Sequence, residues 1–422
     1  MRVVQASSGT WRTRREPGFD QNIAEAAREI IARVRSEGDA ALFALTERFD
    51  GAKLSTLQVS EAETADALQQ VGEEGLQLLR DAAHNIRMFH VKQLRPGFSF
   101  SPRDGVILGQ TVEPLERVGL YVPGGTAAYP STVLMNAIPA HIAGCPHIVI
   151  TTPPGKDGRV NPWVLAAAHL AGVTQVYKIG GAQAIAALAY GTQSIPRVDK
   201  IVGPGNAYVA EAKRQVYGQV AIDMIAGPSE VIIIADGKSN PDHLACDLLA
   251  QAEHDAMASA VLLTPDEALA HAVAQAVEKR LPTLSREAIA RASIQQHGMA
   301  VITRDLDEAM DIANQLAPEH LELSVDNPFD WLPRVRAAGS IFLGRYCPEA
   351  LGDYYAGPNH TLPTNGTARF QSALSVDDFI KKTQYTYYTR GAFLREADAV
   401  ARFATQEGLT AHALSATVRK ES

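Results

Sequence analysis

The segment LAPEHLEL carries two neighbouring side chains that could transfer protons. Pro318 interrupts the preceding helical pattern, and Glu319 and His320 follow it directly. A carboxylate beside an imidazole is suited to general acid and base catalysis near neutral pH, because imidazole titrates there. The same residues would also suit an ordinary helix N-terminus, where Glu319 would face the helix dipole. Residue type alone leaves both interpretations open.

A second candidate lies in HLACDLLAQAEHDA, which is expected to be helical. Gln251 and His254 are three positions apart, so they would share one helix face and could bind one metal ion. Glutamine is an uncommon ligand, and a surface histidine with polar neighbours is the alternative interpretation.

The run GDYYAGPNHTLPT at 352–364 is expected to form an ordered loop, since its Gly, Pro and Asn content argues against a helix or a central strand. It would present Asp353, Asn359 and His360 together, as functional loops often do. In the C-terminal run EGLTAHA, Glu407 and His412 are five positions apart and by themselves read as surface residues.

Three glycine and proline clusters are expected at strand ends, where open α/β sheets bind their ligands: VPGG (122–125), GPGN (203–206) and AGPSE (226–230). The chain contains no GxGxxG hexad, so a standard dinucleotide fingerprint is absent. Glycine lets backbone N–H groups approach an anion, so the clusters favour a ligand with phosphates over simple turns.

The elements that would position these residues indicate an α/β protein. The first hundred residues read as helices, notably NIAEAAREIIARVRSEGD and residues 61–90. Strands alternating with Ala-rich helices then predict a mainly parallel sheet. After residue 365 strand signals fade, and a helical tail that must pack on another surface is expected. The expected strands are HIVITT (147–152), TQVYKI (174–179), VDKIV (198–202), EVIIIAD (230–236), AVLLT (260–264), MAVITR (299–304) and SIFLG (340–344).

The composition is that of a globular protein. Of 422 residues, 46% are hydrophobic and 20% charged, which excludes a largely disordered or fibrous chain. The net charge of −8 provides no global attraction to nucleic acid or an anionic membrane. No apolar run is long enough to span a membrane, and no secretory signal begins the chain. Cys145, Cys246 and Cys347 are widely spaced, so a reducing cytoplasm is expected, with Cys145 and Cys246 buried.

Taken together, these runs resemble the histidinol dehydrogenase family, from about residue 20 to about residue 418. The resemblance is densest in GLYVPGGTAAYPSTVLMNAIPAHIAGC, GGAQAIAALAYGT, VDKIVGPGNAYVAEAKRQV, AIDMIAGPSEV, DLLAQAEHD, APEHLEL, GDYYAGPNHTLPT and EGLTAHA. Several runs in one order are far more specific than any single motif.

The resemblance implies a role for each matching residue. It implies one zinc ion per subunit and two NAD molecules per turnover, with Glu319 and His320 as the catalytic pair. The zinc ligands would be Gln251, His254, Asp353 and His412, which with Ser229, His320, His360 and Glu407 would also contact the substrate, while Tyr121, Gln183 and Asn206 would contact NAD.

The implied activity is the oxidation of L-histidinol through L-histidinal to L-histidine, the final step of histidine biosynthesis. A related zinc- and NAD-dependent dehydrogenase acting on a sulfonated diol is the alternative. Glu407 favours the first, because a carboxylate suits an ammonium group and repels a sulfonate.

The implied fold is a pair of similar, incomplete Rossmann-type α/β domains related to aldehyde dehydrogenases. Residues 1–20 would form an N-terminal arm, residues 21–115 with 228–366 one discontinuous domain, and residues 116–227 the NAD-contacting domain. Residues 367–422 would be a helical tail exchanged with the partner in a homodimer.

Overall fold

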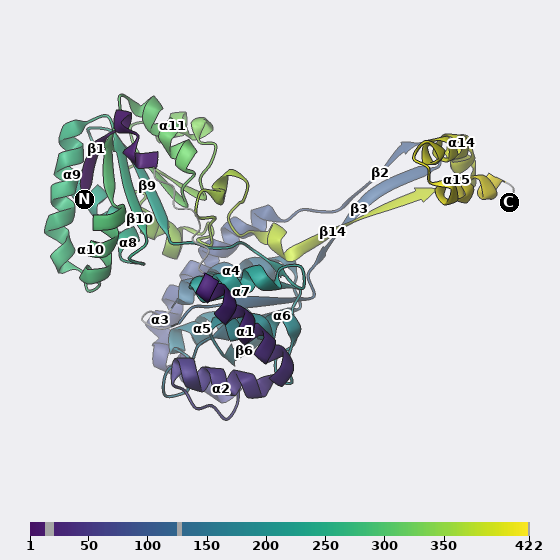
Figure 1. Cartoon of the computed structure of the whole chain (residues 1–422), viewed down its shortest axis with the longest axis horizontal. Coiled ribbons are helices and arrows are strands. Elements are labelled where there is room, and N and C mark those ends of the chain that lie inside the picture. The colour runs from purple at the N-terminus through teal and green to yellow at the C-terminus, as the bar shows by residue number, and fades with distance from the viewer. Residues whose placement is uncertain (13–20, 125–128, 421–422) are drawn as a thin grey trace. The chain divides into compact units, whose positions relative to one another are not determined.

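The computed structural model describes residues 1–12, 21–124 and 129–420 (Figure 1). The chain divides into two units. The first contains residues 1–93 and 115–379, and the second contains residues 94–114 and 380–422. The first unit carries two parallel sheets, and the second carries an antiparallel sheet with two helices. Within the described ranges, no helix combines the length and the apolarity needed to cross a membrane.

The six-stranded sheet has the order β1-β11-β10-β9-β12-β13, and all its strands are parallel. Side chains alternate between its faces, so Ile233 packs with the α8 to α10 cluster and Ile232 with the α11 cluster. The strands are β1 (Arg2–Gln5), β9 (Glu230–Ala235), β10 (Ser259–Thr264), β11 (Met299–Ile302), β12 (His320–Ser324) and β13 (Ser340–Leu343), and the helices are α8 (Pro241–Ala252), α9 (Glu267–Arg280), α10 (Glu287–His297) and α11 (Leu306–Leu316).

The five-stranded sheet is also parallel, in the order β6-β5-β4-β7-β8. Helices α3, α4 and α5 pack on one face, and α1, α2, α6 and α7 on the other. The strands are β4 (Arg117–Tyr121), β5 (His147–Thr152), β6 (Gln175–Lys178), β7 (Lys200–Val202) and β8 (Ala221–Ile222), and the helices are α1 (Gln21–Glu37), α2 (Asp39–Asp50), α3 (Glu61–His90), α4 (Pro130–Ala143), α5 (Pro162–Leu170), α6 (Gly181–Tyr190) and α7 (Ala207–Val216).

Local sequence signals set several of these boundaries. Helix α3 begins with a capping box, in which Ser60 and Glu63 satisfy each other's backbone N–H groups. Gly38 separates α1 from α2 at φ +58°, a conformation that favours glycine. Helix α6 is apolar on nearly every side and accordingly lies in the core. The first unit is completed by two short helices, α12 (Pro328–Trp331) and α13 (Glu349–Leu351), and a π-helical turn at Gly352–Ala356.

The second unit is an antiparallel ribbon that ends in two helices (Figure 1). Its strands are β2 (Phe98–Arg103), β3 (Val106–Pro114) and β14 (Ile380–Tyr388), in the order β14-β3-β2. Helices α14 (Arg390–Gln406) and α15 (Thr410–Thr417) pack on each other. Phe403 and Leu414 are 71% and 65% exposed, so this unit leaves large apolar side chains uncovered by its own chain.

The α/β class and all seven expected strands are confirmed, but four details of the sequence prediction differ. Helices α1 to α3 pack on the five-stranded sheet, and of these α3 also contacts residues 352–356 through the Asn85 hydrogen bond to the Tyr355 carbonyl oxygen. Residues 2–5 of the expected arm add an edge strand to the six-stranded sheet. The tail is not wholly helical, because β14 pairs with β3. Residues 13–20 of the arm lie outside the described residues.

The fourth difference concerns LAPEHLEL, which forms no helix start. His320–Ser324 is the central strand β12, paired with β9 and β13. The sequence analysis did not predict this strand, because the run contains charged residues and interior strands of a parallel sheet are normally apolar.

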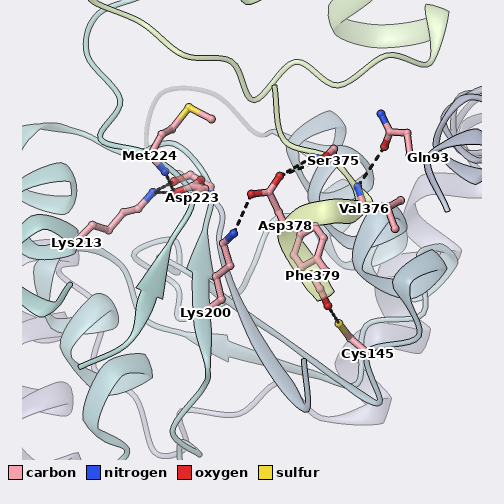
Figure 2. Close-up of polar contacts among 11 residues, drawn as sticks. Gln93, Cys145, Lys200, Lys213, Asp223, Met224, Ser375, Val376, Asp378 and Phe379 are labelled. Atoms are coloured by element: carbon pink, nitrogen blue, oxygen red, sulfur yellow. Dashed lines mark hydrogen bonds and ion pairs between the residues drawn. The ribbon is translucent and has the colours of Figure 1, made fainter. Parts of the chain in front are cut away.

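A buried ion pair fixes the loop that follows β7 (Figure 2). The side chains of Lys213 and Asp223 are 2% and 1% exposed, and they pair directly. Asp223 accepts the N–H of Gly203 at 2.7 Å, and Lys213 donates to the Gly203 carbonyl oxygen at 2.9 Å. A side chain at Gly203 would collide with the Tyr121 carbonyl oxygen, since a Cβ there would lie 2.2 Å away. The ion pair therefore sets the path of the GPGN segment.

The same view shows how residues 375–379 are held in the first unit (Figure 2). Lys200 Nζ lies 2.8 Å from Asp378, and the Gln93 side chain accepts the N–H of Val376 at 3.1 Å. The Phe379 carbonyl oxygen accepts from the Cys145 thiol at 3.6 Å. These contacts fix the chain where it enters β14.

Replacing Lys213 with Met should lower the free energy of unfolding by about 3–5 kcal/mol, because Asp223 would stay buried without its counter-charge. Urea unfolding measures the effect. Lys238→Met is the control, since the Lys238–Asp326 pair is exposed and its loss should change little. Equal stability of the two variants would show that the buried pair does not support the fold.

Candidate functional site

The Glu319–His320 pair is held by the backbone of one residue, Glu230, in the neighbouring strand β9. Glu319 and His320 are 7% and 3% exposed. Glu319 Oε2 accepts the N–H of Glu230 at 2.9 Å, and His320 Nδ1 lies 3.1 Å from the Glu230 carbonyl oxygen. A carbonyl oxygen can only accept, so this contact requires Nδ1 to carry the proton. His320 Nε2 is buried with no hydrogen-bond partner in the described chain, and it carries the lone pair when the imidazole is neutral.

A cluster of donor atoms able to hold a metal ion lies beside this pair. One ligand atom each from His254, Glu349 and Asp353 lies within 4.8 Å of the others. The Gln251 amide lies against the same cluster. When its nitrogen is oriented toward Glu349, this nitrogen donates to the two carboxylate oxygens at 2.5 and 2.6 Å, and the amide oxygen accepts from the Glu230 N–H at 3.2 Å. Nitrogen and oxygen donors without thiolate fit a catalytic zinc ion.

The site concentrates negative charge around one imidazole. His320 Nδ1 lies 3.6 Å from Glu319 and 3.9 Å from Glu349, and His320 Nε2 lies 3.5 Å from Asp353. Burial lowers the pKa of His320, but these three carboxylates outweigh it and raise the pKa well above its usual range. Burial also raises the pKa of Glu319 to about 7 and that of Glu349 well above normal. A bound cation would offset this charge.

His360 lies beside Asp353 of the cluster, and Ser229 directly precedes Glu230 in the chain. His360 Nδ1 lies 3.0 Å from the Asp353 carbonyl oxygen, and Nε2 lies 3.3 Å from the Thr132 hydroxyl. Burial lowers the pKa of His360, so the neutral imidazole is favoured. Ser229 directly precedes β9, and its carbonyl oxygen accepts the N–H of Ser259. Glu407, which ends α14, and His412 in α15 are both exposed residues of the second unit.

The residues expected to contact NAD line one cavity of about 1480 Å³ in the first unit. Tyr121 accepts the N–H of Gly181 at 3.1 Å, and burial raises its pKa to about 12, so it remains a phenol. Gln183 is 1% exposed, and its Oε1 has no hydrogen-bond partner within the described ranges. The Asn206 oxygen caps α7 by accepting from Tyr208 and Val209.

The cavity lies where a ligand is expected in an open α/β sheet. Residues 123–124, 152–157, 181–183 and 206 of its lining follow strands β4, β5, β6 and β7. The chain order reverses direction at β4, which has β5 on one side and β7 on the other. Ligands bind at such a switch point, outside the carboxyl ends of the strands.

The structure corrects several local predictions. The AGPSE cluster precedes β9, so it lies at the amino ends of the strands instead of the ligand-binding carboxyl ends. The first residues of GDYYAGPNHTLPT form a π-helical turn rather than a loop. Asn359 is 4% exposed and donates to the Met135 carbonyl oxygen, so it holds α4 in place. Cys246 is exposed, and all three cysteines are free.

Three acidic residues were missed by the sequence analysis. Glu349 precedes Asp353 by four positions, a spacing that could have identified it as a neighbour on a helical turn. Glu322 and Asp247 form a buried acidic pair behind it, and Glu322 accepts the Glu349 N–H at 2.8 Å. Burial and the mutual repulsion of the pair raise the pKa of Glu322 to about 8, and burial raises that of Asp247 to about 6.

As pH rises, Glu322→Gln should gain stability relative to the wild-type protein. The folded-state pKa of Glu322 is above its ordinary value of 4.5, so its contribution is fully present below pH 4.5 and is lost as pH rises through about 8. Between pH 5 and pH 9 the variant should gain on the order of 2 kcal/mol relative to wild type, measured by urea unfolding.

The control for this pH series is Glu47→Gln, which removes an exposed carboxylate. A Glu322→Gln profile that parallels those of wild type and of this control would contradict the buried-acid assignment.

The fold and site together define an α/β protein with a buried carboxylate–imidazole pair beside donor atoms that could hold a cation. Residues 13–420 match the histidinol dehydrogenase family, and the chain belongs to that family. Family membership makes it an oxidoreductase.

Individual relatives agree with this assignment. The chain is 56% identical to the histidinol dehydrogenase of Geobacillus kaustophilus over 393 residues, which cover 93% of each chain. It is similar to a crystal structure of histidinol dehydrogenase from Elizabethkingia anophelis, with a TM-score of 0.95, 38% identity and coverage of 100% and 98%. An acetylating aldehyde dehydrogenase from Geobacillus thermoglucosidasius shares the fold alone, with a TM-score of 0.50, 11% identity and coverage of 89% and 99%.

Proposed function

We propose that the protein oxidises L-histidinol through L-histidinal to L-histidine, with reduction of two NAD molecules, as the last step of histidine biosynthesis. The observation that carries this proposal is the buried His320, whose Nε2 has no hydrogen-bond partner within the described ranges and lies 3.5 Å from Asp353 of the His254–Glu349–Asp353 cluster. A base next to a cation site is the arrangement that alcohol oxidation requires. The histidinol dehydrogenases to which the chain is similar support the choice of substrate.

Gln251, His254 and Asp353 would hold one zinc ion, with His412 as the fourth protein ligand. Glu349 would orient the Gln251 amide, against which its carboxylate lies. When bound, the metal supplies orientation, because the amine and imidazole nitrogens of the substrate are themselves suitable ligands.

In the first oxidation, His320 Nε2 takes the hydroxyl proton as the carbinol hydride passes to NAD, giving the aldehyde, NADH and a proton. In the second, Glu319 takes a proton from a water molecule that attacks the aldehyde carbon, and the protonated His320 returns its proton to the aldehyde oxygen, which gives the hydrate and restores the base. His320 then takes a hydroxyl proton from the resulting hydrate as a second hydride leaves, and the carboxylic acid forms. The chemistry needs no cysteine nucleophile, and the three free cysteines take no part in it.

Ser229, His360 and Glu407 would contact the substrate, along with His320 and the metal ligands. Glu407 would pair with the substrate ammonium and disfavour a sulfonated alcohol. Tyr121, Gln183 and Asn206 would bind NAD in the cavity, so residues 116–227 would carry the cofactor. The unsatisfied Gln183 oxygen is available to accept from such a ligand.

The protein would act as a homodimer in the cytoplasm. The tail of one subunit would supply Glu407 and His412 to the site of the other, and the exposed Phe403 and Leu414 would be covered in the dimer. Free cysteines suit a reducing compartment.

The decisive measurement is the stoichiometry of the purified enzyme. We expect one zinc ion per subunit by elemental analysis, and two NADH formed per L-histidinol, with L-histidine as product. One NADH per substrate, or turnover of a sulfonated diol in preference to histidinol, would refute the proposed activity.

Glu319→Gln should impair the aldehyde step by about two to four decades and the alcohol step much less, because only the aldehyde step needs an activated water. Single-turnover assays with histidinol and with histidinal separate the two. His320→Ala is the comparison variant and should impair both steps. Equal loss of both steps in Glu319→Gln would contradict this division of roles.

Co-expression of His412→Ala with His320→Ala should restore activity that neither variant has alone. In a heterodimer with exchanged tails, one site receives both lesions and the other receives neither, so about half of the sites recover. Activity is measured on heterodimers purified with two different affinity tags. Inactive heterodimers would show that each tail serves its own subunit.

A further inference from the structure

One carboxylate in the 1480 Å³ cavity lacks the hydrogen bonds that the others have. Asp50 Oδ2 is buried with no hydrogen-bond partner in the part of the chain that the structure describes. The other acidic residues of the lining are all engaged. Glu63 binds Lys178 at 2.9 Å, Asp66 binds Arg159 at 3.3 Å and Gln70 at 2.8 Å, and Asp157 accepts the Arg159 N–H at 3.1 Å.

The position of Asp50 does not serve its own helix. Asp50 is the last residue of α2, and Gly51 at φ +69° ends the helix there. A carboxylate at a helix C-terminus faces the negative end of the helix dipole, which is unfavourable. Burial raises the pKa of Asp50 to about 6, and its charge contributes to the raised pKa of Tyr121 in the same cavity. A buried acceptor without a donor costs free energy, so a ligand that donates to Asp50 would be stabilised.

The chemistry of a dinucleotide decides which of its groups fits. Its phosphates are negatively charged acceptors, whereas its ribose hydroxyls and its adenine and carboxamide amino groups are donors. Of these donors, the two adjacent ribose hydroxyls can both bind one carboxylate, so Asp50 suits a ribose. Among the described lining residues of the cavity, none belongs to the Glu319–His320 site. The reacting nicotinamide must lie near His320, and the cavity is therefore left for the adenosine half.

We propose that Asp50 accepts hydrogen bonds from the hydroxyls of the adenosine ribose and thereby selects NAD over NADP. This inference rests on the proposed NAD-linked activity. A 2′-phosphate at that position would remove a donor and place a second negative charge beside a buried carboxylate. The cationic lining residues Arg48, Lys156 and Arg159 are all exposed. The Arg48 guanidinium lies over the Phe49 ring, 5.1 Å from its centroid, and Arg159 already pairs with Asp66. They provide no buried counter-charge for a 2′-phosphate.

Asp50→Asn tests the proposal in the zinc-loaded enzyme. The KM for NAD should rise about tenfold to a hundredfold, as expected for loss of hydrogen bonds to a charged acceptor, while kcat changes little. The ratio of kcat/KM for NADP to that for NAD should rise by at least as much. Glu47→Gln is the matched control, because it removes an exposed carboxylate from the same helix outside the cavity lining. An unchanged KM for NAD, or equal losses with NAD and NADP, would overturn the proposal.

Wild-type enzyme provides a second test that needs no variant. By calorimetry, ADP-ribose should bind at least tenfold more tightly than its 2′-phosphorylated or 2′-deoxy forms. Equal affinity for the three would overturn the role of Asp50 even if the enzyme oxidises histidinol with NAD. Absence of that oxidation in wild type would instead refute the proposed function.

Discussion

The parallel pairing of β9 with β12 is the constraint on which the site depends. It places the backbone of Glu230 beside the first residues of β12, where the Glu230 N–H binds Glu319 and the Glu230 carbonyl oxygen faces His320 Nδ1. Because Glu230 belongs to β9, the peptide groups on either side of it cannot turn without breaking the strand pairing. This rigid backbone thus orients the carboxylate and places the proton of the neutral imidazole on Nδ1, so that Nε2 carries the lone pair.

Charge balance is the second determinant of the site. Three carboxylates surround one imidazole, and behind them Glu322 and Asp247 form a further acidic pair. Buried charges of one sign are tolerated only when they are protonated or neutralised by a cation. The raised pKa values of Glu319 and Glu322 favour protonation of these two carboxyl groups. A zinc ion at the site proposed at His254 and Asp353 would provide the neutralising cation.

The Glu319–His320 pair and the large cavity lie at opposite ends of the strands of their respective sheets. Glu230 and His320 are the first residues of their strands, so the Glu319–His320 pair lies at the amino ends of the strands. Tyr121 and Asn206 lie at or after the ends of β4 and β7, so the cavity lies at the carboxyl ends of the strands of the five-stranded sheet. The lysine–aspartate pair beneath Gly203 and the close approach to Tyr121 shape the loop there. A buried ion pair and single glycines do this without a GxGxxG hexad.

The sequence by itself determined the α/β class, the strands rich in β-branched residues and the residues able to do chemistry, because periodicity and residue type are local properties. It missed β12, since Glu319, His320 and Glu322 look unlike a central strand until tertiary packing buries them against α8 and α13. It also missed Glu349 and Asp50. The role of an acidic residue depends on what surrounds it, and those neighbours come from distant parts of the chain. Only the tertiary structure showed that Asp50 Oδ2 is buried without a partner, while the other carboxylates of its cavity are satisfied.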